Sequence, residues 1–200
     1  MATQIFSLLP WVSLAAAAAT GVRPGCSDVT FTISATSESP FYSVAPDAYN
    51  ETDIINFVHA VLSGTVLPAL GTEPVSGTFS INGVYCRPAV AKPDDVLQIL
   101  VHGITYNQTM WSGMGFGDYY NYHKFANFNG YHTLAIDRLG HGSNSEHPDP
   151  FGVVGGAIQV EIMHQLIGLV KGNSRGNPLG RTFNKIAYVS CLVPACRRPS

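Results

Sequence analysis

Apolar and polar residues alternate in the first half of the chain, whereas the second half carries nearly continuous apolar runs. Residues 29–33 and 75–81 alternate with a period of two, as half-buried strands do. The second run leads into Asn82-Gly83, a dipeptide typical of a tight hairpin turn, so the chain is expected to return as a strand over 84–86. This first half therefore predicts a strand-rich region.

Three segments are expected to be helical, the first and third from the spacing of their apolar residues and the second from its many aromatic residues. A glycine, which commonly ends a helix, follows each segment within two residues. These segments are 53–63, 119–129 and 158–170. In the third, the expected buried stripe is Ile158, Ile162, Leu166 and Leu169. The aromatic residues of the second are expected to pack in the core and along the helix, namely Tyr119, Tyr120, Tyr122, Phe125 and Phe128.

Three apolar runs in the second half, 96–101, 132–137 and 185–189, are typical of parallel strands buried on both faces. Because helices separate them, the order predicts an α/β fold with a parallel sheet and flanking helices. We expect the strand-rich region to occupy 21–92 and this sheet to occupy 93–189.

The first twenty residues predict an export signal. An apolar run over 5–19 ends in consecutive alanines, and it is shorter than the roughly 20 apolar residues that a spanning helix needs. We therefore expect a secreted, extracellular protein without a stable membrane anchor. Two N-glycosylation sequons, at Asn50 and Asn107, agree with export, although such triplets also arise by chance.

Composition narrows the functional classes. Charged residues make up only 12% of the chain and the formal net charge is −2, so no basic surface for nucleic acid is expected. Cys26 and Cys86 bracket the strand-rich region and, in an oxidising compartment, are expected to form a disulfide; the alternative is two buried free thiols. Cys191 and Cys196 either close a small loop or stay free.

Four motifs follow one another in the second half of the chain: 100–106, 135–143, 147–150 and 160–166. In this order and spacing they resemble the α/β-hydrolase family, and they look most like its exported fungal branch. The resemblance spans nearly half of the chain. It implies an α/β-hydrolase core and, in the complete protein, a small ester-like substrate; the region from Cys26 to Cys86 fits the beginning of that branch more loosely.

The resemblance also assigns a role to His102-Gly103-Ile104, which directly follows the predicted strand 96–101. In this family the loop at that place supplies a backbone N–H to the oxyanion hole, a preorganised donor aimed at the oxygen that becomes negative. Ile104 would offer the N–H, Gly103 would allow close approach of the backbone, and His102 would brace the loop rather than act as a base. The alternative is a simple turn that ends the strand.

The motif that begins at Asp137 has two interpretations. We favour a structural turn in which Gly140 and Gly142 take positive φ and Arg138 pairs with a carboxylate. The alternative is a metal site, whose candidate ligands would be Asp137, His141, His147 and Asp149. Their spacing matches no known metal pattern, so no metal is expected. The glycines of 113–117 do not open from a strand into a helix as a dinucleotide site requires, and no cofactor is expected.

The nucleophile of an α/β-hydrolase lies in a G-x-S-x-G turn after the strand that corresponds to 185–189. In register, Ser190 and Pro194 stand at the two glycine positions and Leu192 stands at the nucleophile. Residues 190–200 therefore depart from the family pattern. We expect the 200 residues to be the N-terminal half of a hydrolase, truncated before its nucleophile, acid and base, and inactive.

A second hypothesis is a non-catalytic secreted protein. It would use the remaining half-fold to bind a partner or a small apolar ligand.

Overall fold

The computed structural model describes residues 25–41, 46–47, 49–65, 71–144, 147–172 and 175–190. The expected signal segment 1–20 and residues 191–200, with Leu192 and both C-terminal cysteines, lie outside the described residues. The elements in chain order are β1 (Cys26–Phe41), α1 (Glu51–Leu62), β2 (Gly71–Cys86), β3 (Val96–Val101), the 3-10 helix η1 (Gln108–Trp111), α2 (Tyr122–Phe128), β4 (His132–Ile136), α3 (Gly156–Lys171) and β5 (Lys185–Ser190).

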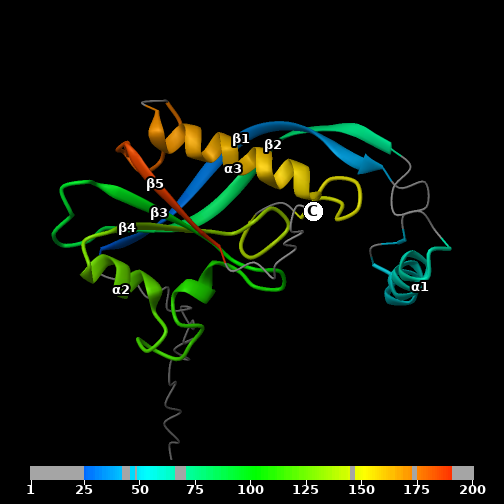
Figure 1. The fold of residues 1–200 in the computed structure, drawn as a ribbon, viewed down its shortest axis with the longest axis horizontal. Helices are drawn as coiled ribbons and strands as arrows, with labels where there is room; N and C mark the ends of the chain where they lie inside the picture. The colour runs from blue at the N-terminus through cyan, green and yellow to red at the C-terminus, as the bar shows by residue number, and fades with distance from the viewer. Residues whose placement is uncertain are drawn as a thin grey trace, which may run out of the picture.

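The strands form one five-stranded sheet in the order β1-β2-β4-β3-β5 (Figure 1). β4, β3 and β5 are parallel, as their continuous apolar runs predict, whereas β1 pairs antiparallel with β2 and β2 pairs antiparallel with β4. The predicted α/β class is confirmed, and the sheet is mixed. Because β2 pairs with β4, the two regions expected at 21–92 and 93–189 share this sheet.

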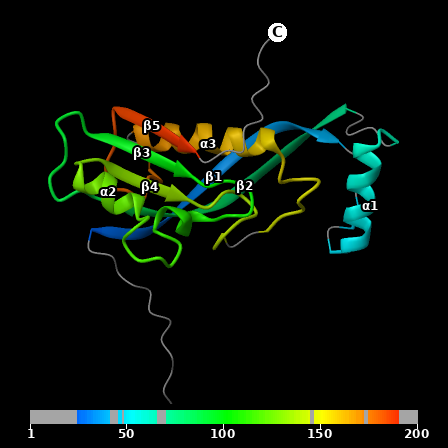
Figure 2. The same cartoon turned by 60° about the horizontal axis from the view of Figure 1, so that its bottom comes forward.

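Helices cover both faces of the sheet, and the alternation of side chains along β3 shows how. Leu97, Ile99 and Val101 belong to the main core, to which the buried face of α3 contributes. Leu100 points the other way, into a smaller cluster with Trp111 of η1. Figures 1 and 2 show α3 and α2 on opposite sides of the strands. The buried stripe of α3 differs from the expected one in one position, since Val170 is buried and Leu169 only partly.

α1 confirms the predicted helix but not the burial of its apolar face. Asn50 caps its first turn by accepting hydrogen bonds from the Thr52 and Asp53 N–H groups. None of its residues is buried, and Leu62 is 80% exposed. Figure 2 shows α1 beyond the far ends of β1 and β2, apart from α3.

The prediction of a hairpin at Asn82-Gly83 is wrong, because β2 runs without interruption through both residues. At this point β2 begins to pair with β4 while it still pairs with β1, so Gly83 faces Val29 on one side and Ile136 on the other. A Cβ at Gly83 would lie 2.6 Å from the Ala135 carbonyl oxygen. The glycine therefore serves a close approach of strands rather than a turn.

The disulfide expected between Cys26 and Cys86 is present, and the two residues are direct partners in the β1–β2 register. Cys86 is completely buried. The bond closes a segment of 60 residues, for which the chain-entropy account gives about 4 kcal/mol of stabilisation. It ties the start of β1 to the end of β2, next to the point where the chain leaves for β3.

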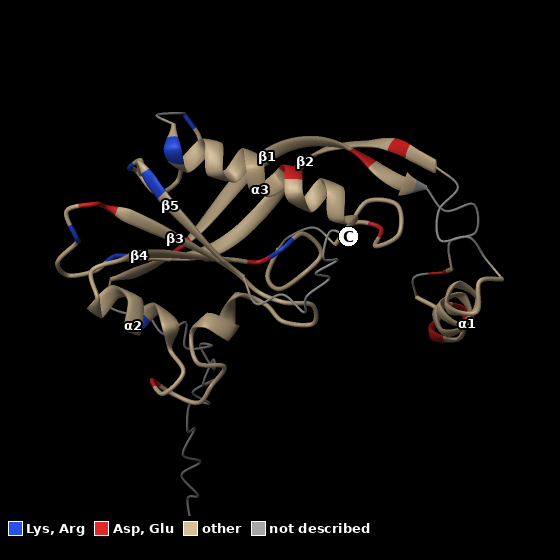
Figure 3. Cartoon of the chain, viewed as in Figure 1, with Lys and Arg blue, Asp and Glu red and all other residues tan. Residues whose placement is uncertain are grey.

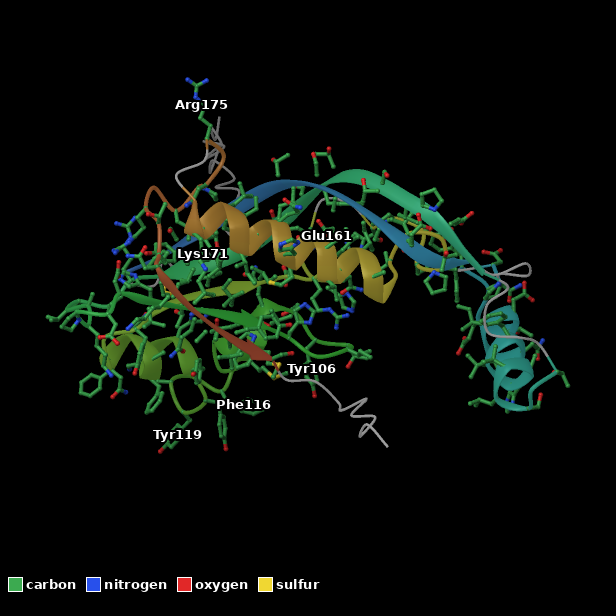
Figure 4. The ribbon with its side chains drawn as sticks, turned by 45° about the horizontal axis from the view of Figure 1, so that its top comes forward. Tyr106, Phe116, Tyr119, Glu161, Lys171 and Arg175 are labelled. Atoms are coloured by element: carbon green, nitrogen blue, oxygen red, sulfur yellow. A yellow bond between two sulfur atoms is a disulfide. The ribbon has the colours of Figure 1, made fainter. Side chains whose placement is uncertain are left out.

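The aromatic segment differs from its prediction. α2 begins only at Tyr122, after the N-cap Asn121. Tyr122 packs against Trp111 and donates a hydrogen bond to Gln98. Its neighbours are mostly exposed instead of buried, with exposed fractions of 94% for Tyr119, 73% for Tyr120, 65% for Phe125 and 90% for Phe128. Figure 4 shows Phe116 and Tyr119 projecting from the lower edge of the ribbon, away from α3.

Replacing Gly83 with alanine is expected to lower the free energy of unfolding by about 1–3 kcal/mol, because the new Cβ overlaps the backbone of β4. Urea unfolding of the purified chain measures this. Gly71→Ala is the matched control, since Gly71 lies in the same strand with nothing within 4 Å of its ideal Cβ. Equal stability of both variants would contradict the close approach.

Candidate functional site at the carboxyl ends of β3 and β4

The loops that leave β3 and β4 are held together by His102. Its side chain is buried, and both ring nitrogens are engaged. The Arg138 main-chain N–H donates to Nε2 at 3.0 Å, so Nδ1 carries the proton and donates it to the Gly103 carbonyl oxygen at 2.8 Å. His102 therefore connects the first residues after β3 with the first residues after β4.

This arrangement needs an uncharged imidazole, because Nε2 accepts a hydrogen bond. Burial lowers the pKa of His102, and the hydrogen bond to the Gly103 carbonyl opposes this effect in part. The ring of His141 lies close by, with ring centroids 5.1 Å apart. His102 thus has no nitrogen left to act as a base.

Ile104 lies at an exposed position. The residue is 65% exposed, and its N–H makes no hydrogen bond to any residue that the structure describes. The next residue, Thr105, has φ of 72°, a left-handed conformation that is costly for a β-branched residue. The Tyr106 N–H closes the turn on the Gly103 carbonyl at 3.4 Å.

Asp137 joins the loop after β4 to η1. Its buried carboxylate accepts hydrogen bonds from the Gln108 N–H at 2.7 Å and from both the N–H and the hydroxyl of Ser143 at 2.9 and 3.0 Å. Gly142 has φ of 65°, and a Cβ there would lie 2.1 Å from the Asp137 carboxyl carbon. Gly140 also has positive φ, at 76°. The loop therefore wraps closely around the carboxylate.

Asn82 supports the same loop from β2. Its carbonyl oxygen accepts from the Asp137 N–H at 2.8 Å, its own N–H donates to the Asn144 side chain at 2.8 Å, and its side-chain amide donates to the Ser143 carbonyl at 2.6 Å. The sequence analysis assigned no role at this site to Asn82, Gln108, Ser143 or Asn144, since it named Asn82 only for a turn and Ser143 only as the end of the motif 135–143. Asn82 and Gln108 contact residues at least 29 positions away in the chain, and no local pattern shows such contacts.

The prediction that Arg138 pairs with a carboxylate is wrong. The Arg138 side chain donates from Nε to the Gln159 amide oxygen of α3 at 2.6 Å, and no ion pair joins it to a carboxylate in the described part of the chain. A neutral acceptor stands where a charged one was expected, because the side chain of Asp137 is turned toward Gln108 and Ser143.

The candidate metal ligands are engaged separately. Asp137 accepts hydrogen bonds from the protein, the His141 ring contacts the Leu139 carbonyl at 3.1 Å, and Asp149 accepts from the Phe151 N–H at 2.9 Å. Among the described residues, no three His, Cys, Asp or Glu side chains group as metal ligands would.

The sequons lie on helix starts. Asn50 is exposed at the start of α1. Asn107 is half-buried at the start of η1, where its side-chain oxygen accepts from the N–H and hydroxyl of Thr109 at 3.0 and 2.6 Å.

A second, partly buried polar cluster lies at the opposite ends of the strands. Arg181 donates to Asp95, whose other oxygen lies 3.3 Å from His132 Nε2, and Tyr85 Oη lies 2.9 Å from His132 Nδ1. Burial, together with the Arg181 charge, lowers the pKa of His132. No pattern in the sequence predicted this cluster.

Charged side chains are sparse and mixed in sign over the described ribbon (Figure 3). Several cations are paired with acids, as in Lys124–Asp118 and Lys185–Asp94. No basic stripe suited to nucleic acid appears on these residues. None of the helices in the described part of the chain has the length and apolarity to cross a membrane.

No protein-family model and no curated protein sequence matches the chain. Among solved structures, a novel bacterial esterase is similar with a TM-score of 0.33 and 17% identity, over 65% of this chain and 33% of that chain. A variant of aCif is similar with a TM-score of 0.32 and 14% identity, over 76% of this chain and 40% of that chain. The chain thus spans well under half the length of either structure. Both TM-scores are below 0.5, and neither likeness assigns a function.

The stability of the fold is expected to fall as pH drops below about 6.5, the ordinary pKa of histidine. Because the folded pKa of His102 is lowered, the unfolded chain binds more protons between the two pKa values, and the free energy of unfolding rises with pH across that window. One such group contributes up to about 1.4 kcal/mol per pH unit. Urea midpoints between pH 5 and 8 measure the slope.

His102→Gln is expected to reduce this slope. His59→Gln, at an exposed position of α1, is the control and should leave it unchanged. A slope that is equal in the His102 variant and in the unmodified chain would show that His102 does not resist protonation.

Proposed function

We propose that residues 96–190 form the oxyanion-loop half of an α/β-hydrolase core that acts, in the complete protein, on small ester-like molecules. One observation carries this proposal. Val101 pairs with Ser190 at the ends of β3 and β5, so the chain leaves both strands at the same edge of the sheet. An oxyanion donor after β3 and a nucleophile after β5 need this adjacency.

The geometry around Ile104 supports the same proposal. A donor for an oxyanion has to be fixed in place before the reaction and free of internal partners. His102 fixes the loop through Gly103 and Arg138, while the Ile104 N–H has no acceptor among the described residues. In this proposal Ile104 donates the N–H and His102 is a positioning residue.

We further propose that the 200-residue chain does not hydrolyse esters. Leu192 stands at the nucleophile position and has no atom that attacks a carbonyl, and neither flanking position of the elbow is a glycine. Both ring nitrogens of the neutral His102 are already in hydrogen bonds, so His102 also offers no base to the hydroxyl of Ser190.

The purified 200-residue chain is therefore expected to show no turnover of a p-nitrophenyl ester above the buffer blank, and no labelling by a fluorophosphonate probe. An active serine esterase in the same assay serves as the positive control. Turnover that a serine-directed inhibitor abolishes would contradict the proposal, and Ser190→Ala would then show whether Ser190 is responsible.

The transcript distinguishes the hydrolase from a non-catalytic binding protein. Reads across the codons that follow Val189 should contain a form that continues into G-x-S-x-G if the chain derives from a hydrolase gene. Abundant message that encodes only residues 190–200 as printed, without such a form, would favour the non-catalytic hypothesis.

Export is part of the same proposal. Mass spectrometry of material secreted from a eukaryotic host is expected to show cleavage near Ala19, glycan at Asn50 and the Cys26–Cys86 bond. Asn50→Gln is the control that should remove the glycan mass at that site. Retention of residues 1–20 on an intracellular product would contradict export.

A further inference from the structure

A cavity of about 520 Å³ opens between β5 and α3, at the carboxyl ends of the parallel strands. Its walls are mostly apolar and include Val101, Met163, Ile167 and Tyr188. This volume lies within the range of small-molecule sites, roughly 300–1,000 Å³, which combine apolar walls with a few polar groups. An apolar chain would therefore find enough surface here to leave water.

Arg138 gives this mostly apolar cavity a charged end. Among the described residues that line it, Arg138 is the one with a permanent charge, and none is acidic. Its Nε is engaged by Gln159, whereas its two terminal amino groups make no hydrogen bond to any described residue. They remain available as a pair of donors from a planar guanidinium.

The surroundings make this cation receptive to an anion. Burial lowers the pKa of the Arg138 guanidinium, and the nearby Tyr188 opposes this effect. A guanidinium nevertheless stays protonated in proteins, and no carboxylate of the described residues pairs with it to offset the part of its hydration that is lost. A planar carboxylate matches the two free amino groups and supplies the missing charge.

We propose that this cavity binds a monocarboxylate with an aliphatic tail, whose carboxylate pairs with Arg138 and whose tail lies along Met163, Ile167 and Tyr188. A dicarboxylate would place its second charge among mostly apolar walls on which the described residues offer no second permanent positive charge. The cavity shares His102 and Ser190 with the candidate site, but the binding proposed here needs only Arg138 and the apolar walls and no ester hydrolysis.

Calorimetric titration of the purified chain with octanoate, octan-1-ol and octylamine at pH 7.5 tests the inference. Octanoate is expected to bind at least tenfold more tightly than octan-1-ol, since it adds charged hydrogen bonds to the same tail, and octylamine is expected not to bind. Equal affinity for octanoate and octan-1-ol, or binding of octylamine, would overturn it.

Two variants locate the binding. Arg138→Gln is expected to weaken octanoate at least tenfold and to leave octan-1-ol unchanged. Gln159→Glu places an internal carboxylate beside Arg138 and should abolish octanoate binding by competition while the cation is kept. Because both residues lie outside the sheet, the circular dichroism spectrum and urea midpoint check that the variants fold.

Undiminished octanoate binding in the Gln159→Glu variant would refute the assignment even if Arg138→Gln failed to fold. Met163→Trp fills the cavity and is expected to remove octanoate and octan-1-ol binding together. Since the readout is heat of binding rather than ester turnover, failure here leaves the hydrolase proposal standing, and failure of that proposal leaves this one.

Discussion

The antiparallel pairing of β2 with β4, which begins at Gly83, determines how the rest of the chain is arranged. It attaches the long β1–β2 ribbon to the parallel strands, and it places Asn82 directly beneath the loop that leaves β4. Through its carbonyl, its N–H and its side-chain amide, Asn82 then holds Asp137, Asn144 and Ser143. The close approach that only a glycine permits therefore fixes the sheet and the candidate site together.

Hydrogen bonds, rather than ion pairs, connect this arrangement to β3. The buried Asp137 carboxylate is satisfied by donors from Gln108 and Ser143, and the uncharged His102 ring joins Gly103 to Arg138. Buried groups of this kind are costly when a partner is lost, so the loops after β3 and β4 have one well-defined relation to each other. A preorganised backbone donor requires a scaffold with this property.

The sequence predicted the parts of the fold that depend on local pattern. The apolar runs of β3, β4 and β5 and the helical spacing of α3 all lie where the sequence placed them. Asn82-Gly83 led to a wrong prediction of a hairpin, because a hairpin turn and a close approach of paired strands can have the same local composition. The aromatic residues around Tyr119 misled for a related reason: hydrophobicity favours burial but does not supply the surface that would cover them.

The same limit applies to the site. His102 and Asp137 were identified from motifs, but the partners of Asp137 come from η1 and from the loop at Ser143, and only tertiary structure brings those together.

Arg138 shows most clearly what the fold adds, because its expected carboxylate partner is replaced by the Gln159 amide. An amide oxygen satisfies one donor without neutralising the charge, so the electrostatic cost of desolvating the guanidinium persists at the wall of an apolar cavity. A carboxylate at position 159 would have cancelled that charge internally and left a cavity without a net positive charge. The neutral acceptor instead orients the guanidinium and leaves its charge directed outward. A ligand with one negative group and an apolar remainder is the chemical complement of such a surface.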